Sequence, residues 1–415
     1  MSYYDDDDLD YENENESTKQ KKKLNASKTI AMDKLEIRDE PVSVNRHPKK
    51  SDKIAGRNQK SGFAKFAEAA FPQAGDAPGE KFRKIFLIAA VIVLIAALVI
   101  LGVQILGIQK GTELNDTIGD IAGSPMSNLI SSSYKRPDYI ENPAPDTATT
   151  AGTEEPPFWD LTPVKNQPLT INFDPLLERN PDTRAWIKIT DTLVNNVVVQ
   201  AANNQYYVTH DFDKNESESG TICSSYLNRW DGTDENIVLF GHNMQNGQFF
   251  SYLVHYYPDD ASRDPLYFYK VHPTIMLATP NGGTDTYKIF AGILVNTQEK
   301  HGQVLNYINK TSFSDVNDFN NFILEVMDRS RFFTEVDIKY GDQLLTLSTC
   351  HWPYGRSVDT RWVVLARKVR PGESDYVDTS TAYRNYQCKM FDYYYKMYGG
   401  AWAGSVWDKS KLLSY

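Results

Sequence analysis

The feature that most constrains the fold of this chain is an uncharged apolar run, IFLIAAVIVLIAALVILGV, at residues 85–103. A helix of this length, at about 1.5 Å per residue, crosses a hydrocarbon core of about 30 Å. A cleaved signal peptide has a shorter apolar region close to the start of the chain, whereas 84 residues precede this run. A buried helix of a soluble protein keeps a polar face, and this run has none. We therefore predict a single transmembrane helix at residues 85–108.

The charges beside the run predict its orientation. Lys81, Arg83 and Lys84 precede it, whereas acidic residues prevail beyond Lys110. Because basic flanks stay on the cytoplasmic side, we expect a cytoplasmic N-terminus and a large extracellular part at the cell membrane. Residues 85–415 carry 27 basic and 38 acidic side chains, and this acidic balance argues against a nucleic-acid partner.

The composition of the chain changes along its length and predicts five segments. Residues 1–84 contain an acidic block followed by a basic block and predict a largely disordered cytoplasmic tail ahead of the span. Residues 109–157 are rich in Ser, Thr, Pro and Gly and predict an extracellular stalk. Apolar content rises in residues 158–370, which predict the folded domain. The aromatic-rich residues 371–415 predict a helical C-terminal extension packed on that domain.

The folded domain has the sequence pattern of a mainly-β protein. Pro280-Asn281-Gly282-Gly283 predicts a hairpin turn, and Asp315–Ser330 has apolar residues at helical spacing. Many short strands with few helices predict a closed β-barrel with helical insertions. The predicted strands are Trp186–Ile189, Asn196–Gln200, Asn236–Phe240, Thr274–Ala278, Tyr287–Val295, Leu344–Ser348 and Trp362–Arg367.

Three cysteines offer a candidate nucleophile. They cannot all pair with one another, so at least one thiol is expected to be free. Cys350 ends an apolar run where a strand gives way to a loop, which is a common position for catalytic groups. Cys223 has the context of a buried strand residue, and Cys388 lies on the predicted terminal helix. The chain lacks Cys-x-x-Cys and His-x-x-x-His spacings, so we predict neither a metal ion nor a cofactor.

Thiol chemistry on an acyl group also needs a proton-transfer partner and a donor for the developing oxyanion. His242 ends the apolar run at residues 237–240, after a glycine that permits a sharp turn. His351 adjoins Cys350, but successive strand residues point to opposite faces, so it is the weaker candidate. Arg361 opens the strand after Cys350, whereas Arg356 lies in the turn-rich segment between them. We predict His242, Cys350 and Arg361 at one rim of the barrel.

These motifs resemble those of sortases. The resemblance rests on Leu347-Ser348-Thr349-Cys350, on Phe240-Gly241-His242-Asn243-Met244 and on an arginine that opens the next strand. It spans roughly residues 168–368, and five upstream stretches narrow it to class B sortases: residues 171–174, 180–187, 197–200, 204–207 and 210–212. The chain departs from the family at His351 and Trp352, where class B members often have a small or acidic residue.

The resemblance implies a membrane-anchored cysteine transpeptidase of Gram-positive bacteria. Such enzymes cut a surface protein within its C-terminal sorting signal, hold it as a thioester and pass it to an amine, usually of a peptidoglycan precursor. By motif matching, Cys350 is the nucleophile, His242 the general acid and base, and Arg361 the oxyanion or substrate-positioning residue.

Two alternatives stay open at this point. The chain could polymerise pilins, with a pilin amine as acceptor, or it could be a non-catalytic membrane-tethered binding protein on a sortase-like barrel. An L,D-transpeptidase requires a glycine before the cysteine and an arginine two residues after it, but Thr349 and Trp352 occupy those positions. Papain-like peptidases place the cysteine before the histidine, which is the reverse of the order found here.

Overall fold

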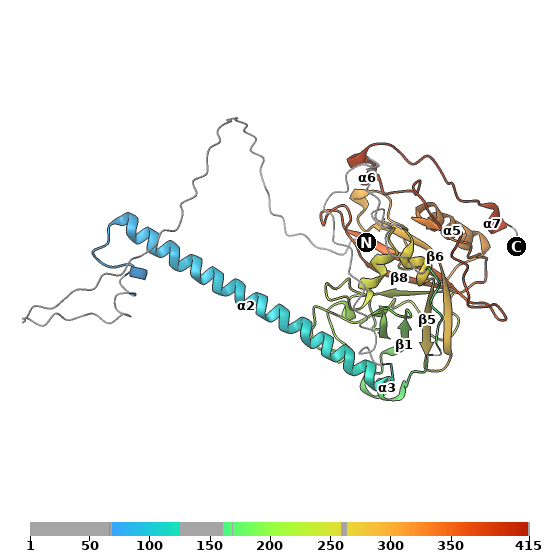
Figure 1. Cartoon of the computed structure of the whole chain (residues 1–415), viewed down its shortest axis with the longest axis horizontal. Coiled ribbons are helices and arrows are strands. Elements are labelled where there is room, and N and C mark those ends of the chain that lie inside the picture. The colour runs from blue at the N-terminus through green and yellow to red at the C-terminus, as the bar shows by residue number, and fades with distance from the viewer. Residues whose placement is uncertain (1–65, 67–68, 125–160, 168, 259–263, 414–415) are drawn as a thin grey trace, which may run out of the picture. The chain divides into compact units, whose positions relative to one another are not determined.

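The structure, a computed structural model, describes residues 66, 69–124, 161–167, 169–258 and 264–413 (Figure 1). The predicted cytoplasmic tail up to residue 65 and the predicted stalk from residue 125 to 157 lie outside the described residues. The chain forms two compact units, Met1–Ala96 and Ala97–Tyr415.

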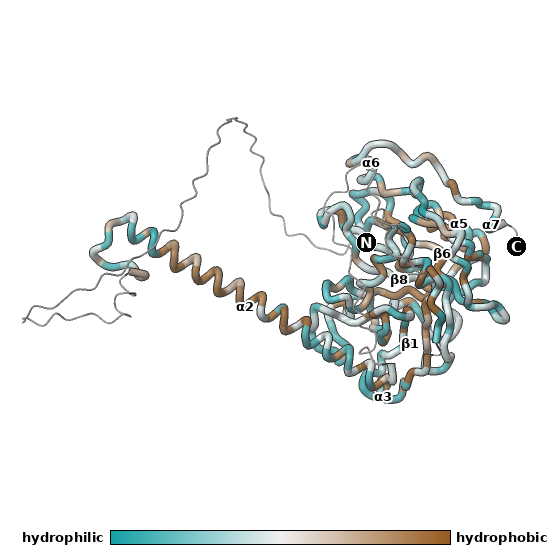
Figure 2. The backbone as a smooth tube through the Cα atoms, viewed as in Figure 1, coloured by the Kyte–Doolittle hydropathy of each residue, from teal (hydrophilic) through white to brown (hydrophobic). Residues whose placement is uncertain are grey.

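A 44-residue helix, α2 (Pro78–Ile121), contains the predicted transmembrane span. Within the described part of the chain it is the one helix long and apolar enough to cross a membrane, and its most apolar window is unburied. Figure 2 shows the largely apolar course of its middle. Such a helix is compatible with a membrane anchor.

The predicted stalk is wrong at its start, because α2 continues through residues 109–121. The reason is packing: Ile118 is buried in a cluster with barrel residues. Polar contacts add to this docking, since Asn196 Nδ2 donates to Asn115 Oδ1 at 2.9 Å. Ser124, just beyond the helix, donates to Asn195 Oδ1 at 2.9 Å. This last part of α2 therefore belongs to the folded domain.

Eight strands close into a barrel in the order β1-β2-β3-β4-β8-β9-β6-β5, which confirms the predicted fold class. The predicted hairpin is confirmed, since β5 and β6 pair antiparallel with Thr279 opposite Gly283. The barrel strands are β1 (Thr183–Lys188), β2 (Asn195–Val199), β3 (Cys223–Ser224), β4 (Asn236–Phe240), β5 (Thr274–Thr279), β6 (Gly283–Asn296), β8 (Leu344–Cys350) and β9 (Thr360–Lys368).

Helices and 3-10 turns fill the connections. The predicted helix at 315–330 is confirmed as α5, where Asp315 caps the backbone N–H groups of Asn317 and Asp318. The elements outside the barrel and α2 are α3 (Asp174–Arg179), η1 (Tyr206–Val208), η2 (Phe250–Tyr256), α4 (Tyr267–Val271), η3 (Glu299–His301), α5 (Val316–Arg329), β7 (Phe332–Phe333), β10 (Tyr383–Arg384), α6 (Asp392–Tyr398) and α7 (Ser410–Leu413).

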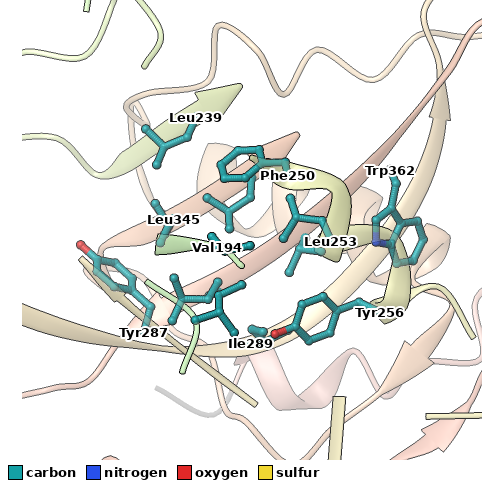
Figure 3. Close-up of a cluster of buried hydrophobic side chains, with 14 of the residues drawn as sticks. Val194, Leu239, Phe250, Leu253, Tyr256, Tyr287, Ile289, Leu345 and Trp362 are labelled. Carbon is teal, nitrogen blue, oxygen red and sulfur yellow. The ribbon is translucent and has the colours of Figure 1, made fainter. Parts of the chain in front are cut away.

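The barrel wall separates two apolar clusters. Leu239, Leu345 and Ile289 belong to the cluster that fills the barrel (Figure 3). Val238 and Leu344, one residue earlier on β4 and β8, pack in the second cluster with residues of α5 outside the wall. Because strand residues alternate between faces, both faces of these strands are apolar, and the strands read as continuous apolar runs.

The predicted helical extension is largely not helical. Only α6 and α7 are helices among residues 371–413, while β10 pairs with β7 in a small separate sheet. Gly399 ends α6 with a φ of 80°, and Gly400 follows with a φ of 81°, a conformation that an α-helix does not allow. Tyr394 and Tyr395, both on α6, pack against the cluster inside the barrel.

Candidate active site

The site begins where β4 and β8, two parallel neighbours, end at the same edge of the barrel. Phe240 is opposite Ser348 in their register, so His242 and Cys350 each lie two residues further along. Hydrogen bonds continue the alignment beyond the paired residues: Gly241 N donates to Ser348 O at 3.2 Å, and Asn243 Nδ2 donates to Cys350 O at 2.9 Å. The structure thus brings the predicted histidine and cysteine together.

Strand alternation places the Cys350 side chain on the outer face of the wall, because Leu344 on β8 faces outward and Cys350 is an even number of residues further along the strand. His242 lies beyond the end of β4, and its ring reaches Val208 O of η1. The neighbouring Tyr207 packs with Phe240 in a cluster outside the wall, so His242 lies on the outer side as well. Arg361 is directly opposite Cys350 in the antiparallel β8–β9 pair and therefore shares this face. The three residues occupy one outer rim.

Gly241 makes the turn before His242 possible. A Cβ at this position would lie 2.8 Å from the Phe250 ring and 3.2 Å from Ile222. Phe250 N also donates to His242 O at 3.0 Å, which holds the turn closed. The glycine is therefore required for the close packing that fixes the histidine.

His242 is anchored through one ring nitrogen. Its Nε2 lies 2.7 Å from Val208 O, so a neutral ring with its proton on Nε2 donates to this carbonyl and leaves Nδ1 as the basic atom. Among the residues that the structure describes, no hydrogen bond joins the ring to Cys350. Proton transfer between the two requires them to come within hydrogen-bond reach in the reacting complex.

Cys350 is a free, half-buried thiol. Burial raises the pKa of Cys350, while the guanidinium of Arg361 opposes this shift. Asp359 adds to the rise and Arg356 opposes it. The thiol is therefore protonated at neutral pH and needs a base before it can attack.

Arg361 is held at one of its three nitrogens. Nη1 donates to Asp359 Oδ1 at 2.5 Å and to Thr360 O at 3.2 Å. Within the described ranges, Nε and Nη2 have no hydrogen-bond partner. Burial disfavours the charge, but Cys350 and Asp359 outweigh it and raise the pKa of Arg361. A permanently charged fork with free donors beside a thiol suits stabilisation of an oxyanion.

The folded domain is similar to proteins of one known family. The model of the sortase domain family matches residues 188–369. Sortase B of Listeria monocytogenes is 27% identical over 175 residues, which are 42% of this chain and 65% of that protein. Sortase B of Staphylococcus aureus is 26% identical over 197 residues, 48% of this chain and 74% of that protein. The X-ray structure of Clostridium perfringens sortase B is 30% identical over 48% of this chain and 100% of that one, with a TM-score of 0.42.

The chain belongs to the class B sortases. The match spans just under two thirds of the Listeria protein, and α2, like the extension after residue 370, lies outside the matched domain.

The sortase domain places His351 on the other face of the wall from Cys350. Its ring packs edge-on to Tyr257 at 4.9 Å, and Tyr257 packs against Trp362 at 5.1 Å. Trp362 belongs to the cluster inside the barrel, so His351 points away from the outer rim. This is the geometry expected from strand alternation.

The second arginine of the β8–β9 segment lies away from the strands. Arg356 is exposed, and its guanidinium lies 4.8 Å from the centre of the Trp352 ring. It lies in the loop that joins β8 to β9, whereas the backbone of Arg361 is fixed by strand pairing.

The other two cysteines of this sortase lie elsewhere. Cys223 is buried in β3, and burial raises the pKa of its thiol to about 12. Cys388 is buried beside Arg331, whose Nη1 lies 3.6 Å from its Sγ. In the part of the chain that the structure describes, no group of three or more His, Cys, Asp or Glu residues could hold a metal ion.

Sequence reasoning missed two residues beside the site. Asp359 accepts the hydrogen bond from Arg361, and the buried Tyr307 hydroxyl lies 2.7 Å from Ser348 Oγ on the outer face of β8. The Asp-x-Arg spacing at the start of β9 was a usable signal for Asp359. Tyr307 comes from an irregular segment, and its sequence gives no comparable signal.

Proposed function

We propose that this sortase is a membrane-anchored cysteine transpeptidase, with Cys350 as nucleophile, His242 as general acid and base, and Arg361 as oxyanion donor. Its substrate is a surface protein with a C-terminal sorting signal, and its acceptor is an amine of the cell wall. The observation that carries this proposal is the shared outer rim of these three side chains.

The geometry supports a two-step acyl transfer. His242 Nδ1 takes the proton of the Cys350 thiol, and the thiolate adds to the scissile carbonyl carbon. The free donors of Arg361 bind the oxyanion. When the tetrahedral adduct collapses, the C–N bond breaks, the imidazolium protonates the leaving amine, and a thioester remains.

The second step reverses the proton movements. The acceptor amine adds to the thioester carbon, its proton passes to His242, and the Cys350 sulfur leaves as the C–S bond breaks. The products are a new amide and the free enzyme, so no oxidant, metal ion or energy source is required.

The charges flanking α2 support the proposed location. Three basic residues precede the apolar run, which favours a cytoplasmic N-terminus and an extracellular sortase domain. Such a domain would meet wall precursors and exported proteins on the outer side of the cell membrane.

The test uses the full chain in detergent micelles with a library of sorting-signal peptides, with and without hydroxylamine as the acceptor probe. Mass spectrometry is expected to show cleaved peptides that carry hydroxylamine on the new C-terminus, and none with Cys350→Ala. Absence of cleavage, together with no labelling of Cys350 by iodoacetamide, would favour a non-catalytic binding protein. Replacing hydroxylamine by purified wall-precursor or pilin amines then distinguishes anchoring from pilus assembly.

A further inference from the structure

The carboxylate of Asp359 is the hub of a small hydrogen-bond network behind Arg361. Oδ1 accepts from Arg361 Nη1 at 2.5 Å and from Trp352 Nε1 at 3.2 Å, while Oδ2 accepts from Thr297 Oγ1 at 2.6 Å. Thr297 N also donates to Asp359 O at 3.1 Å. The carboxylate is thus tied to three segments: the end of β6, the β8–β9 loop and β9.

The network fixes a charge that stays ionised. The Asp359 side chain is 26% exposed. Burial disfavours its charge, but hydrogen bonds from Arg361 and Thr297 outweigh burial and lower the pKa of Asp359. At neutral pH it is a fixed anion that binds one end of the guanidinium.

The way Asp359 binds Arg361 leaves the rest of the guanidinium unused. It takes only Nη1, so Nε and Nη2 remain as donors on the face shared with Cys350. A long arginine side chain loses conformational entropy when it is held in one rotamer. A partner that already holds it lowers the entropy cost that substrate binding would otherwise have to offset.

We propose that Asp359 is a positioning residue, which holds Arg361 by one nitrogen so that its other donors meet the oxyanion, with Thr297 and Trp352 fixing the carboxylate in turn. This inference rests on the proposed role of Arg361 and goes beyond it, because it assigns the control of that arginine to a residue with no contact to the reacting atoms.

The first experiment measures kcat and KM of the full chain with Asp359→Asn, on the library peptide that the wild-type chain cleaves fastest. We expect kcat to fall by about 10- to 100-fold with KM within about twofold, because a misplaced catalytic group lowers the rate of the chemical step. The matched control is Asp337→Asn, which removes a carboxylate from the arginine at the other end of β9 and leaves kcat unchanged. Equal kcat for Asp359→Asn and the wild-type chain would overturn the inference.

The second readout separates positioning from general loosening of the fold. Arg361 lowers the pKa of Cys350 more than the Asp359 carboxylate raises it. A guanidinium released by Asp359→Asn is therefore expected to shift the pH midpoint of Cys350 alkylation by iodoacetamide upward. Mass spectrometry of the Cys350 peptide follows this reaction apart from Cys223 and Cys388. A less acidic thiol together with slower turnover is the expected signature, and a midpoint that is unchanged or lowered would overturn the inference.

A double-variant comparison tests whether Asp359 acts through Arg361. In an Arg361→Ala background, Asp359→Asn is expected to lower kcat by less than twofold, and an undiminished loss would overturn the inference. If Asp359→Asn does not fold, Thr297→Val is the substitute, because it removes the hydroxyl that donates to the Asp359 carboxylate. It is also expected to lower kcat. If the proposed function itself were wrong, the wild-type chain would cleave no peptide at all. That result differs from failure of the Asp359 inference, in which the wild-type chain cleaves and the variant does so equally well.

Discussion

The two ends of strand β9 each carry an arginine, and the two are used in different ways. Arg367, near the end of the strand, donates from all three of its nitrogens. Nε donates to the backbone carbonyl of Asp337, Nη2 to the Asp337 carboxylate and Nη1 to the Glu373 carboxylate. Its side chain is 2% exposed. Arg361, near the start of the strand, is bound at Nη1 alone. A guanidinium with every donor occupied stabilises the structure, whereas one with free donors beside a thiol is available for chemistry.

The surroundings of the two arginines follow the same division. At the Arg367 end, Lys288 and Arg370 add further ion pairs to Glu373, Asp337 and Asp342, and these tie the start of the C-terminal extension to the barrel. At the Arg361 end, the nearest titratable groups include a thiol whose pKa is raised by burial. At the Arg367 end, the basic side chains are paired with carboxylates. At the Arg361 end, the Cys350 thiol is protonated and needs a base before it can react.

The largest effect is expected from Cys350→Ala. It should abolish both cleavage and thioester formation while the fold is kept, because no other cysteine lies at the rim that carries His242. Turnover by mass spectrometry and a thermal melt check the two parts. Cys223→Ala and Cys388→Ala are the controls, and loss of turnover in either of them, with activity kept in Cys350→Ala, would contradict the assignment.

His242→Ala is expected to lower turnover by about 10²–10⁴-fold, which is the usual contribution of a positioned general acid and base. His351→Ala should only weaken turnover, because its ring packs on Tyr257 at the other face of the wall. The measurement is kcat/KM for both variants on one peptide. The opposite ranking would show that strand alternation does not hold at the end of β8.

Arg361→Ala is expected to reduce turnover by about 10²–10³-fold, the typical effect of deleting one oxyanion donor. Arg361→Lys should also lose much of the rate, because an ammonium lacks the planar fork that Asp359 holds at one end. The difference between these two variants measures how much of the effect depends on fork geometry rather than charge. Equal, near-normal rates for both would remove Arg361 from the mechanism.

The parts of the fold set by local sequence were predictable. Apolar strands with turn signals predicted the barrel, and the end of β8 predicted the position of Cys350, because a strand fixes where its last residue points. His242 follows the end of the neighbouring strand β4. The pairing of Asp359 with Arg361 had a local signal in the Asp-x-Arg spacing, but its contact with Thr297 had none, since Thr297 is 62 residues away and comes close only through β6–β9 pairing.

The ends of the domain were predicted less well for the same reason. The helical state of residues 109–121 depends on docking contacts such as Asn115 with Asn196, which are 81 residues apart. The extension was expected to be helical from its aromatic content. Its path before α6 is set instead by distant pairing, since Tyr383 and Arg384 of β10 pair with Phe333 and Phe332 of β7.

Arg356→Ala is expected to have a small effect, about two- to fivefold on turnover. Its guanidinium stacks on Trp352, and an exposed cation–π contact is worth about 0.5–1 kcal/mol. It also opposes the rise in the pKa of Cys350, although less than Arg361 does. A loss as large as that of Arg361→Ala, measured on the same peptide, would transfer the oxyanion role to Arg356.

Arg367→Ala should leave turnover per folded molecule unchanged and act on stability alone. Removing one partner from a buried charge cluster costs about 3–5 kcal/mol, and we expect the lower end because Asp337 is 44% exposed and can be rehydrated. The Arg367 guanidinium lowers the pKa of Glu373 well below its usual range. This contribution to stability is therefore complete above the usual carboxyl pKa of about 4.3 and is lost as pH falls from there towards the lowered value.

The measurement is a pair of thermal melts, for the wild-type chain and Arg367→Ala, from pH 7 downward, with kcat recorded at pH 7. The difference in Tm should shrink as the solution becomes acidic, because protonated Glu373 no longer depends on its arginine. Arg361→Ala is the matched variant on the same strand: turnover is low, and the melt falls less than in Arg367→Ala because one ion pair rather than two is broken. If Arg367→Ala lowered kcat as strongly as Arg361→Ala does, the count of occupied donors would not separate a structural arginine from a catalytic one.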